Sequence, residues 1–222
     1  MKIITLPALI LLPAVITAAE TPNPTSTAVR WVAKSQEYKA VCQQTYATAM
    51  EKVEAAAKVS TGSWAIVMDI DETVLSNVRY QIELNARSAS HSQKAWEAWV
   101  ARSEAGPVPS AKDFILRLRA LPRGRIIFLS NRFARGMEAT RRNLRKHGLT
   151  TANDVFLLRK NREDTKANRR NEVISGTGRM ASHGTLRVLA WFGDAAHDFP
   201  DDDKLKWGTH KFMLPNPVYG GW

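Results

Sequence analysis

Five short runs of apolar residues stand out along a chain whose polar and apolar positions otherwise follow helical spacing or no spacing. They cover residues 64–68, 125–129, 155–158, 186–192 and 211–214. Runs this short are typical of strands that are buried on both faces of a sheet. The pattern therefore predicts a buried sheet built from these five segments.

Helical spacing fills the intervals between the runs. Amphipathic stretches cover 110–121, 134–146 and 164–175, and the last begins at a capping residue, Asp164 or Thr165. Before the first run, apolar positions recur at helical spacing from Trp31 onward, which predicts one helix that ends near Lys58. Strand–helix alternation predicts an α/β fold, with a parallel sheet and helices on both of its faces.

Polar residues follow three of the apolar runs directly. Asp69, Ser130 and Asp194 each stand where a predicted strand ends. In a parallel sheet the ligand binds outside the carboxyl ends of the strands. The sequence therefore predicts a single site at one edge of the sheet.

One segment, 76–109, interrupts the alternation after the first strand. It carries Tyr80, Trp96 and Trp99 and then a Gly-Pro-Val-Pro turn. We interpret it as a small helical cap inserted into a single domain that spans 20–222.

The N-terminus has the pattern of a secretory signal peptide. Lys2 precedes an apolar stretch over 3–16, and the small residues 17–19 suit cleavage after Ala19. The segment 1–19 is therefore expected to be a signal peptide, which indicates a periplasmic or secreted protein. No cysteine stands directly after the apolar stretch, so no lipid membrane anchor is expected.

Composition and charge narrow the class of ligand. The chain has 222 residues with 44% apolar and 24% charged residues, which is typical of a globular domain. Its formal net charge of +11 favours anionic ligands, and much of the excess lies between Arg132 and Arg170. No zinc-finger spacing or Gly/Arg-rich tail is present, so no nucleic-acid partner is expected.

Two pairs of carboxylates supply candidate metal ligands. Asp69 and Asp71 are two apart in an extended segment and are expected to face the same way. Asp194 and Asp198 are four apart, so one helical turn would bring them together, and Gly193 allows a tight turn before them. A divalent cation would relieve the repulsion between such carboxylates, and oxygen ligands alone favour Mg²⁺. His197 is expected to point away from Asp194 and Asp198.

Donors for phosphate oxygens follow the second strand. Ser130, Asn131 and Arg132 offer a hydroxyl, an amide and a guanidinium, and Lys166 stands at a predicted helix start. Lys160 is close enough along the chain to be an alternative to Lys166. Together with the carboxylates, these residues predict phosphoryl transfer, with Asp69 as nucleophile and Asp71 as general acid and base.

The four groups resemble the motifs of the haloacid dehalogenase superfamily. Residues 69–73 match the first motif, Ser130 the second, Lys166 the third, and Asp194 with Asp198 the fourth. Residues 68–75, the helix beginning near Trp31 and the closing segment 214–222 are similar to class C acid phosphatases, a group of secreted and lipoprotein phosphatases of bacteria. The chain departs from that pattern at Ser76, where relatives commonly carry Asp.

The resemblance implies a Rossmann-like core with a helical cap, a bound Mg²⁺ and acid phosphatase activity on phosphomonoesters, including 5′-nucleotides. Trp96 and Tyr219 match aromatic positions that hold a base in relatives. Packing of the cap onto the core is an alternative role for Trp96, and a plain surface or hinge role is one for Tyr219.

Two other functions stay open for the sequence. A phosphotransferase would use the same phospho-aspartate, and a non-catalytic basic binding or storage protein would keep the fold without turnover. The expected partner is a small phosphomonoester, and a homodimer is left open.

Overall fold

The computed structural model describes residues 25–220, so the expected signal peptide over 1–19 lies outside the described residues. A five-stranded parallel sheet forms the centre of the molecule, in the order β5-β4-β1-β6-β7. Its strands are β1 (Trp64–Met68), β4 (Gly124–Phe133), β5 (Val155–Arg159), β6 (Arg187–Gly193) and β7 (Lys211–Met213). The predicted α/β fold with a parallel sheet is confirmed.

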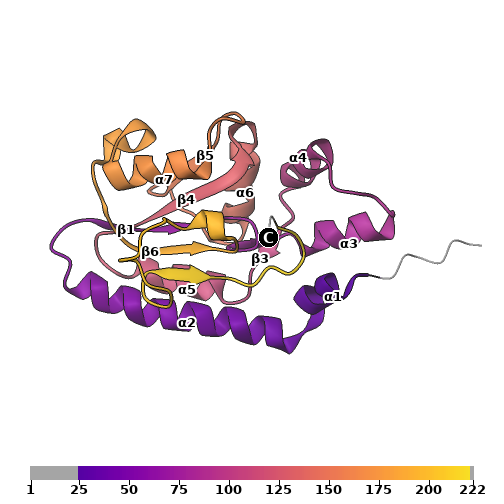
Figure 1. Cartoon of the computed structure of the whole chain (residues 1–222), viewed down its shortest axis with the longest axis horizontal. Coiled ribbons are helices and arrows are strands. Elements are labelled where there is room, and N and C mark those ends of the chain that lie inside the picture. The colour runs from indigo at the N-terminus through magenta and orange to yellow at the C-terminus, as the bar shows by residue number, and fades with distance from the viewer. Residues whose placement is uncertain (1–24, 221–222) are drawn as a thin grey trace, which may run out of the picture.

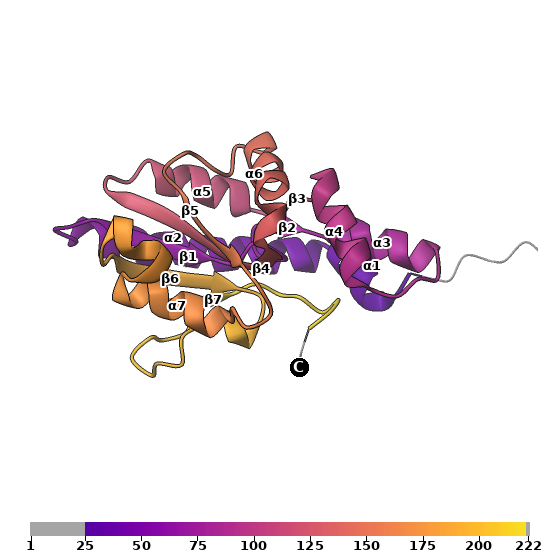
Figure 2. The same cartoon turned by 90° about the horizontal axis from the view of Figure 1, so that it is seen from above.

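Helices cover both faces of the sheet (Figures 1 and 2). Ile66 and Met68 of β1 belong to the larger apolar cluster, which the sheet shares with α2 (Gln36–Lys58), α5 (Ala111–Arg119) and α6 (Met137–Lys146). The alternate residues, Ala65 and Val67, belong to a second cluster that includes α7 (Lys166–Ser175) and the 3₁₀ helix η2 (Gly178–His183). Because strand side chains alternate, an all-apolar strand buries both faces at once.

The N-terminal helical segment differs from the prediction of one helix. It forms α1 (Thr27–Lys34) and α2, separated at Ser35, whose ψ of 146° is extended. The Ser35 Oγ accepts a hydrogen bond of 3.0 Å from the backbone N–H of Tyr38 and so caps α2. The single-helix prediction was wrong because helical spacing continues across a residue that starts a new helix.

Strand β4 is longer than its apolar run. It was predicted to end at Leu129 but continues to Phe133, with a register shift against β5 between Ser130 and Phe133. The donors after Leu129 therefore lie within the irregular end of a strand and not on a loop beyond it.

The segment between β1 and α5 stands beyond the carboxyl ends of the strands. A short antiparallel pair, β2 (Leu75–Ser76) and β3 (Gly106–Pro107), closes its base. Two helices, α3 (Val78–Ala86) and α4 (Gln93–Arg102), lie between these strands and extend to the right of the sheet in Figure 1. Of the helices described, none has the length and apolar character needed to cross a membrane.

Candidate active site

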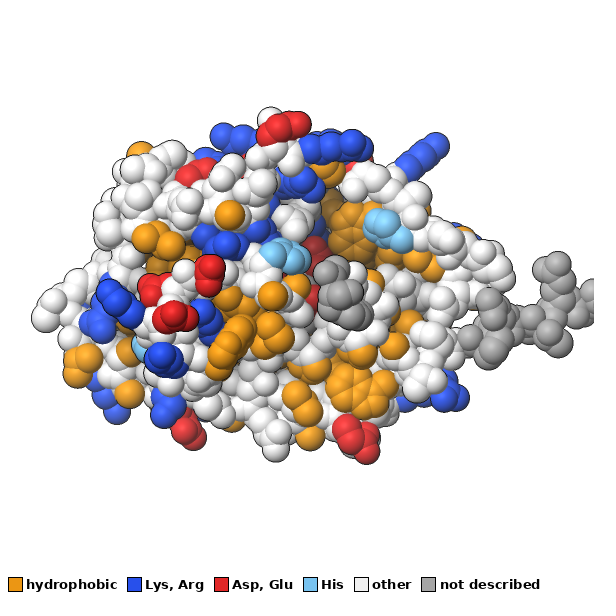
Figure 3. All heavy atoms as spheres, in the orientation of Figure 1, with side chains coloured by type: hydrophobic (Ala, Val, Ile, Leu, Met, Phe, Trp, Pro, Cys, Tyr) orange, Lys and Arg blue, Asp and Glu red, His pale blue; other side chains and the backbone are white. Residues whose placement is uncertain are grey.

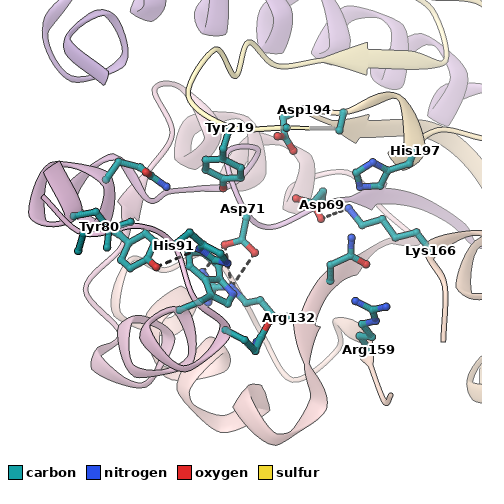
Figure 4. A pocket seen from close by; sticks show the side chains of 18 of the residues that line it. Asp69, Asp71, Tyr80, His91, Arg132, Arg159, Lys166, Asp194, His197 and Tyr219 are labelled. Atoms are coloured by element: carbon teal, nitrogen blue, oxygen red, sulfur yellow. Dashed lines mark hydrogen bonds and ion pairs between the residues drawn. The ribbon is translucent and has the colours of Figure 1, made fainter. Parts of the chain in front are cut away.

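A cavity of about 620 Å³ lies between the carboxyl edge of the sheet and the inserted helices α3 and α4 (Figure 4). Strand β1 leads into Asp69, β4 carries Asn131 and Arg132, and β6 leads into Asp194. Lys166, the first residue of α7, also lines the cavity. In Figure 3 the same face shows a hollow with acidic side chains inside it and Lys and Arg side chains beside it.

A tight turn follows Asp69 at the end of β1. The backbone N–H groups of Val74 and Leu75 both donate to the carbonyl of Ile70, at 2.9 and 2.8 Å. Glu72 takes a left-handed conformation, with a φ of 55°, which is uncommon for a residue with a side chain. The hydroxyl of Tyr46, a buried residue of α2, donates a hydrogen bond of 2.6 Å to the carbonyl of Thr73. The turn is thus held by its own backbone and by a buried helix.

Lys166 joins two carboxylates at the floor of the cavity. Its Nζ donates to Asp69 Oδ1 at 2.5 Å and also to Asp198 Oδ1. All three side chains are at least 94% buried, which leaves the ammonium group and the carboxylates as each other's main partners. Lys166, and not Lys160, is the lysine that the structure brings to Asp69.

Three carboxylates come close enough to share a metal ion. Asp69, Asp194 and Asp198 each offer a ligand oxygen, and these oxygens lie within 4.8 Å of one another. Asp194 is oriented by the Asn216 side chain, which donates to its Oδ2 at 2.8 Å. A set of carboxylate oxygens fits a hard divalent cation, so the donor chemistry agrees with a divalent metal at this position.

Asp71 does not join that group, unlike the expectation that it would help to hold the metal. Arg132 Nη2 donates to Asp71 Oδ1 at 2.7 Å, and the Asn77 amide donates to the same oxygen at 3.0 Å. Asp71 still lines the cavity (Figure 4). The reason for the difference is that the buried Arg132 guanidinium pairs with the Asp71 carboxylate and neutralises it, whereas the sequence led us to expect that Asp71 would bind the metal ion.

Arg132 therefore has a different partner from the phosphate expected for it. Its side chain is 1% exposed and is occupied by Asp71 and by the Thr140 hydroxyl at 3.3 Å. It orients a carboxylate at the cavity surface, although it also lines the cavity.

Asp198 is held by the chain that leads into it. Its Oδ2 accepts hydrogen bonds of 3.0 Å from the backbone N–H groups of Asp194 and Ala195. A side chain on Gly193 would bring a Cβ within 2.2 Å of the Asp198 Cβ, so only glycine fits there. Gly193 was predicted to permit a tight turn, and the structure shows that close approach to Asp198 is its constraint.

Ser130 and Asn131 sit at the irregular end of β4. Ser130 is fully buried, and its Oγ lies 3.4 Å from Asp71 Oδ2 while it accepts from the backbone N–H of Arg132 at 3.2 Å. Asn131 lines the cavity, and its side-chain oxygen accepts from Arg169 Nη2 at 2.7 Å. That bond leaves the Asn131 amide N–H groups for a ligand.

Aromatic side chains form one side of the cavity. Trp96 of α4 packs edge-on against Tyr80 of α3, with ring centroids 5.4 Å apart. The Tyr80 hydroxyl lies 3.2 Å from His91 Nδ1. From the C-terminal segment, Tyr219 also lines the cavity, and its hydroxyl donates to Glu72 Oε1 at 3.1 Å (Figure 4). Trp96 therefore packs on Tyr80 within the insertion and also lines the cavity, and its role in holding a base stays a prediction.

Three residues of the site carry little signal in the sequence. Glu72 is buried between Tyr219 and the backbone N–H of Asn77, and Arg159 at the end of β5 lines the cavity. His197 was expected to point away but also lines the cavity, 3.7 Å from Asp198. The segment Ala196–Asp198 is the 3₁₀ helix η3, and its three residues per turn change the direction of each side chain from that of an α-helix.

Burial and neighbouring charges both shift the pKa values of the side chains at the bottom of the cavity. Burial raises the pKa of Asp69 above its ordinary value, although Lys166 acts against that rise. Burial and the nearby Asp198 raise the pKa of Asp194 to about 6. Burial lowers the pKa of Lys166, but Asp69 and Asp198 outweigh it and hold the pKa above its ordinary value. A crowded acidic floor of this kind is favourable for a cation.

Solved structures and a curated relative are similar to this chain. The class C acid phosphatase from Bacillus anthracis matches with a TM-score of 0.73 and 28% identity, covering 87% of this chain and 84% of that chain. A structure of the class C acid phosphatase from the same organism with tungstate bound also has a TM-score of 0.73, at 29% identity and the same coverage. The stem 31 kDa glycoprotein of Glycine max is 27% identical over 158 residues, or 69% of this chain.

The lengths of these relatives differ from that of the chain. The matched region spans 58% of the Glycine max protein. A family model covers far more of the sequence, from residue 12 to residue 222, and takes in every motif described above. The chain therefore belongs to the HAD superfamily, subfamily IIIB, the acid phosphatases.

Proposed function

We propose that this protein is a magnesium-dependent acid phosphatase, which hydrolyses phosphomonoesters through a phosphorylated Asp69. The observation that carries the proposal is the convergence of Asp69, Asp194 and Asp198 with Lys166 at the floor of one cavity. A buried nucleophile beside a lysine and further carboxylates is the arrangement that phosphoryl transfer requires. Membership of the acid phosphatase family supports the same reaction.

Asp69, Asp194 and Asp198 are the residues that would hold the metal. Bound there, Mg²⁺ would offset the negative charge of the carboxylates and of the phosphate. The choice of Mg²⁺ over other cations rests on the oxygen-only donor set.

Asp69 acts as the nucleophile in this mechanism. Its free carboxylate oxygen attacks phosphorus, a bond forms between that oxygen and phosphorus, and the bond from phosphorus to the ester oxygen breaks. Asp71, in its protonated form, gives its proton to the departing oxygen so that an alcohol leaves. Arg132 and Asn77 hold the Asp71 carboxyl group in place for this transfer.

Hydrolysis of the acyl phosphate completes the cycle. Asp71, now a carboxylate, takes a proton from a water molecule as the water oxygen attacks phosphorus. The bond between phosphorus and Asp69 breaks, which releases inorganic phosphate and restores the carboxylate. Lys166 stabilises the negative charge on the transferring group in both steps, because its ammonium group is fixed beside Asp69.

The aromatic side of the cavity supports 5′-nucleotides as substrates. Trp96 and Tyr219 both line the cavity that contains Asp69, and a base can stack on such rings. Stacking of this kind contributes roughly 1–3 kcal/mol per base. The Tyr219 hydroxyl is already bonded to Glu72, so the ring is held in place before a base binds.

Export is part of the proposal. The positive start, the apolar stretch and the small residues before Glu20 support a secreted or periplasmic enzyme. The residues concerned, 1–19, lie outside those that the structure describes.

Phosphate release tests the proposed function. A chromogenic phosphomonoester and a 5′-nucleotide are each incubated with the protein across pH, with Mg²⁺ or with a chelator, beside Asp69→Asn as the control. Release that needs the metal and disappears in the control supports the mechanism. Glycerol added as an acceptor distinguishes a phosphotransferase, since it would then appear as glycerol phosphate. Folded, metal-loaded protein that releases no phosphate from either substrate would rule the proposal out.

A further inference from the structure

A second cavity, of about 670 Å³, adjoins the one that contains Asp69. The two share Gln93 of α4 and Arg159, the last residue of β5. The second cavity is further lined by Phe133, Arg135, Lys160, Asn161, Arg162 and Glu163. A molecule that is bound at Asp69 and extends past Arg159 therefore enters a space bordered by basic side chains.

Most of that positive charge has no carboxylate partner among the described residues. Arg135 is neutralised by Glu97, to which its Nε donates at 2.9 Å. The three remaining cations, Arg159, Lys160 and Arg162, form no ion pair within residues 25–220, and Glu163 is the one acid that lines the cavity. We call Arg159, Lys160 and Arg162 the basic rim.

Arg159 is fixed in position without losing its charge. Its Nε and Nη2 donate to the backbone carbonyls of Asn161 and Arg162, at 3.0 and 2.7 Å. Carbonyl groups orient the guanidinium but do not neutralise it. Figure 4 shows Arg159 at the edge of the first cavity, on the same side as Lys166. The basic rim thus begins at Arg159, at the edge of the cavity that contains Asp69 and Lys166.

A substrate with one phosphate would leave this positive charge unused. Lys166 lies at the floor against Asp69, whereas Lys160 and Arg162 line the second cavity alone. Cations at separate places match an anion that is charged at two places. Arginine and lysine side chains bind phosphate oxygens, and each exposed one, such as Lys160 or Arg162, contributes a modest part.

We propose that the basic rim binds a second phosphate, so that the enzyme prefers small organic bisphosphates, such as nucleoside 3′,5′-bisphosphates, over the corresponding monophosphates. The preferred turnover of bisphosphates rests on the proposed function for the reaction at Asp69, whereas the binding of a phosphate by the basic rim does not. One phosphate occupies the floor, and the other lies against Arg159, Lys160 and Arg162. The cavities are of similar size, which suits two groups of similar size on one small molecule.

The rival explanation is unspecific attraction of anions by a basic surface. Such attraction raises the association rate of every anionic substrate and is screened by salt. A ratio separates the two explanations: kcat/KM for adenosine 3′,5′-bisphosphate divided by kcat/KM for adenosine 5′-monophosphate. A bound second phosphate makes this ratio depend on the rim in particular, whereas unspecific attraction makes it depend on net charge, so that loss of any three exposed cations lowers it equally.

Three variants test the rim. Arg159→Gln/Lys160→Gln/Arg162→Gln is expected to lower the ratio about tenfold at low ionic strength, since each exposed pair contributes a modest part. Lys160→Gln/Arg162→Gln should lower it about threefold, and it leaves the backbone contacts of Arg159 intact. Glu163→Gln should raise the ratio about twofold because it removes the one acid beside the rim.

The matched control removes three exposed cations of α2, a helix that lines neither cavity. Lys39→Gln/Lys52→Gln/Lys58→Gln changes the same net charge on the exposed side of α2, and the ratio should stay as in the wild type. An equal fall in the ratio for this control and for the rim variants would overturn the proposal in favour of unspecific attraction.

Binding is measured separately from turnover. Calorimetry on Asp69→Asn, with and without the rim substitutions, gives the dissociation constants of the same two nucleotides. Rim-dependent, tighter binding of the bisphosphate by Asp69→Asn, together with a wild-type protein that releases no phosphate, would refute the proposed function and keep the anion site. Equal binding of both nucleotides refutes the anion site. Tighter binding of a 5′-phosphorylated oligonucleotide than of the bisphosphate would replace the small substrate with a nucleic-acid end.

Discussion

The floor and the wall of the cavity are built in different ways. We use floor for Asp69, Lys166, Asp194 and Asp198, and wall for the aromatic side chains Tyr80, His91, Trp96 and Tyr219. The floor stands on the ends of the sheet and the start of α7, and ion pairs tie its side chains together. The wall comes largely from α3 and α4, which a two-stranded ladder closes at the base and which pack on each other through the rings of Tyr80 and Trp96.

Because of this difference, we expect the floor to carry out the reaction and the wall to select the substrate. A reacting group needs a position fixed to a fraction of an ångström, which buried, hydrogen-bonded side chains on rigid strands provide. A binding surface tolerates more variation, and aromatic rings accept any flat group. Changes in the floor should therefore lower kcat, whereas changes in the wall should raise KM for particular substrates.

The largest effect is expected from Lys166→Met. Loss of a donor that stabilises the transferring group should lower kcat by about 10²–10³ for every phosphomonoester. The substitution also leaves Asp69 and Asp198 facing each other without a cation, which costs about 3–5 kcal/mol in metal-free protein. Phosphate release and thermal unfolding without metal measure both effects.

Lys58→Met is the matched control for this experiment. Lys58 is exposed at the far end of α2, and its loss should alter neither quantity. A Lys166→Met enzyme that keeps more than about half of its kcat would contradict the role given to the floor.

Asp194→Asn is expected to weaken the metal more than the fold. Outer partners of a metal site already change affinity by about 10–100-fold, so loss of a ligand should raise the Mg²⁺ requirement by about 100-fold. Titration of activity with Mg²⁺ gives the half-saturating concentration. Asp202→Asn serves as control, because this exposed aspartate caps a turn by accepting from the Lys204 N–H at 2.9 Å. An unchanged Mg²⁺ requirement in Asp194→Asn would remove Asp194 from the metal site.

The apolar runs were sufficient to predict the sheet. Each predicted strand exists, because a fully buried strand needs apolar residues on both faces. The ends were less accurate: β4 continues through Ser130 to Phe133 because its backbone pairs with β5, which apolar spacing does not report. Ser35 likewise divides one periodic segment into two helices.

The floor was foreseeable from residue type and order, but its pairings were not. A sequence shows that Arg132 and Asp71 are charged, yet only the fold decides that the guanidinium meets the carboxylate rather than a ligand. The direction of His197 depended on whether the turn was α-helical or 3₁₀. Glu72 and Arg159 gave little signal of their place in the site, because burial and cavity lining arise from distant segments.

A smaller and more selective effect is expected in the wall from Trp96→Leu. Loss of one stacking ring should raise KM for a 5′-nucleotide about tenfold and leave kcat nearly unchanged. Glycerol phosphate, which has no ring to stack, should show little change. Trp207→Leu is the matched control, since this indole is 57% exposed and lies outside the residues that line the cavity. If KM rises equally for both substrates, Trp96 acts through packing of the insertion and not through stacking.

The smallest effect is expected where the wall meets the core, at the ion pair between Glu97 of α4 and Arg135 of η1 (Ala134–Gly136). The hydrogen bonds from Arg135 lower the pKa of Glu97 below its ordinary value, so the pair contributes above about pH 4.3 and is lost as pH falls through the lower folded pKa. Glu97→Gln should therefore raise KM for a 5′-nucleotide less than about twofold at pH 6 and leave kcat unchanged, because exposed pairs contribute little. The difference between wild type and variant should shrink as pH falls below about 4.3 and through the lowered pKa of Glu97, because the wild-type pair is lost there. A difference that does not shrink as pH falls, or a fall in kcat, would show that Glu97 acts on the floor and that the two regions are not separable.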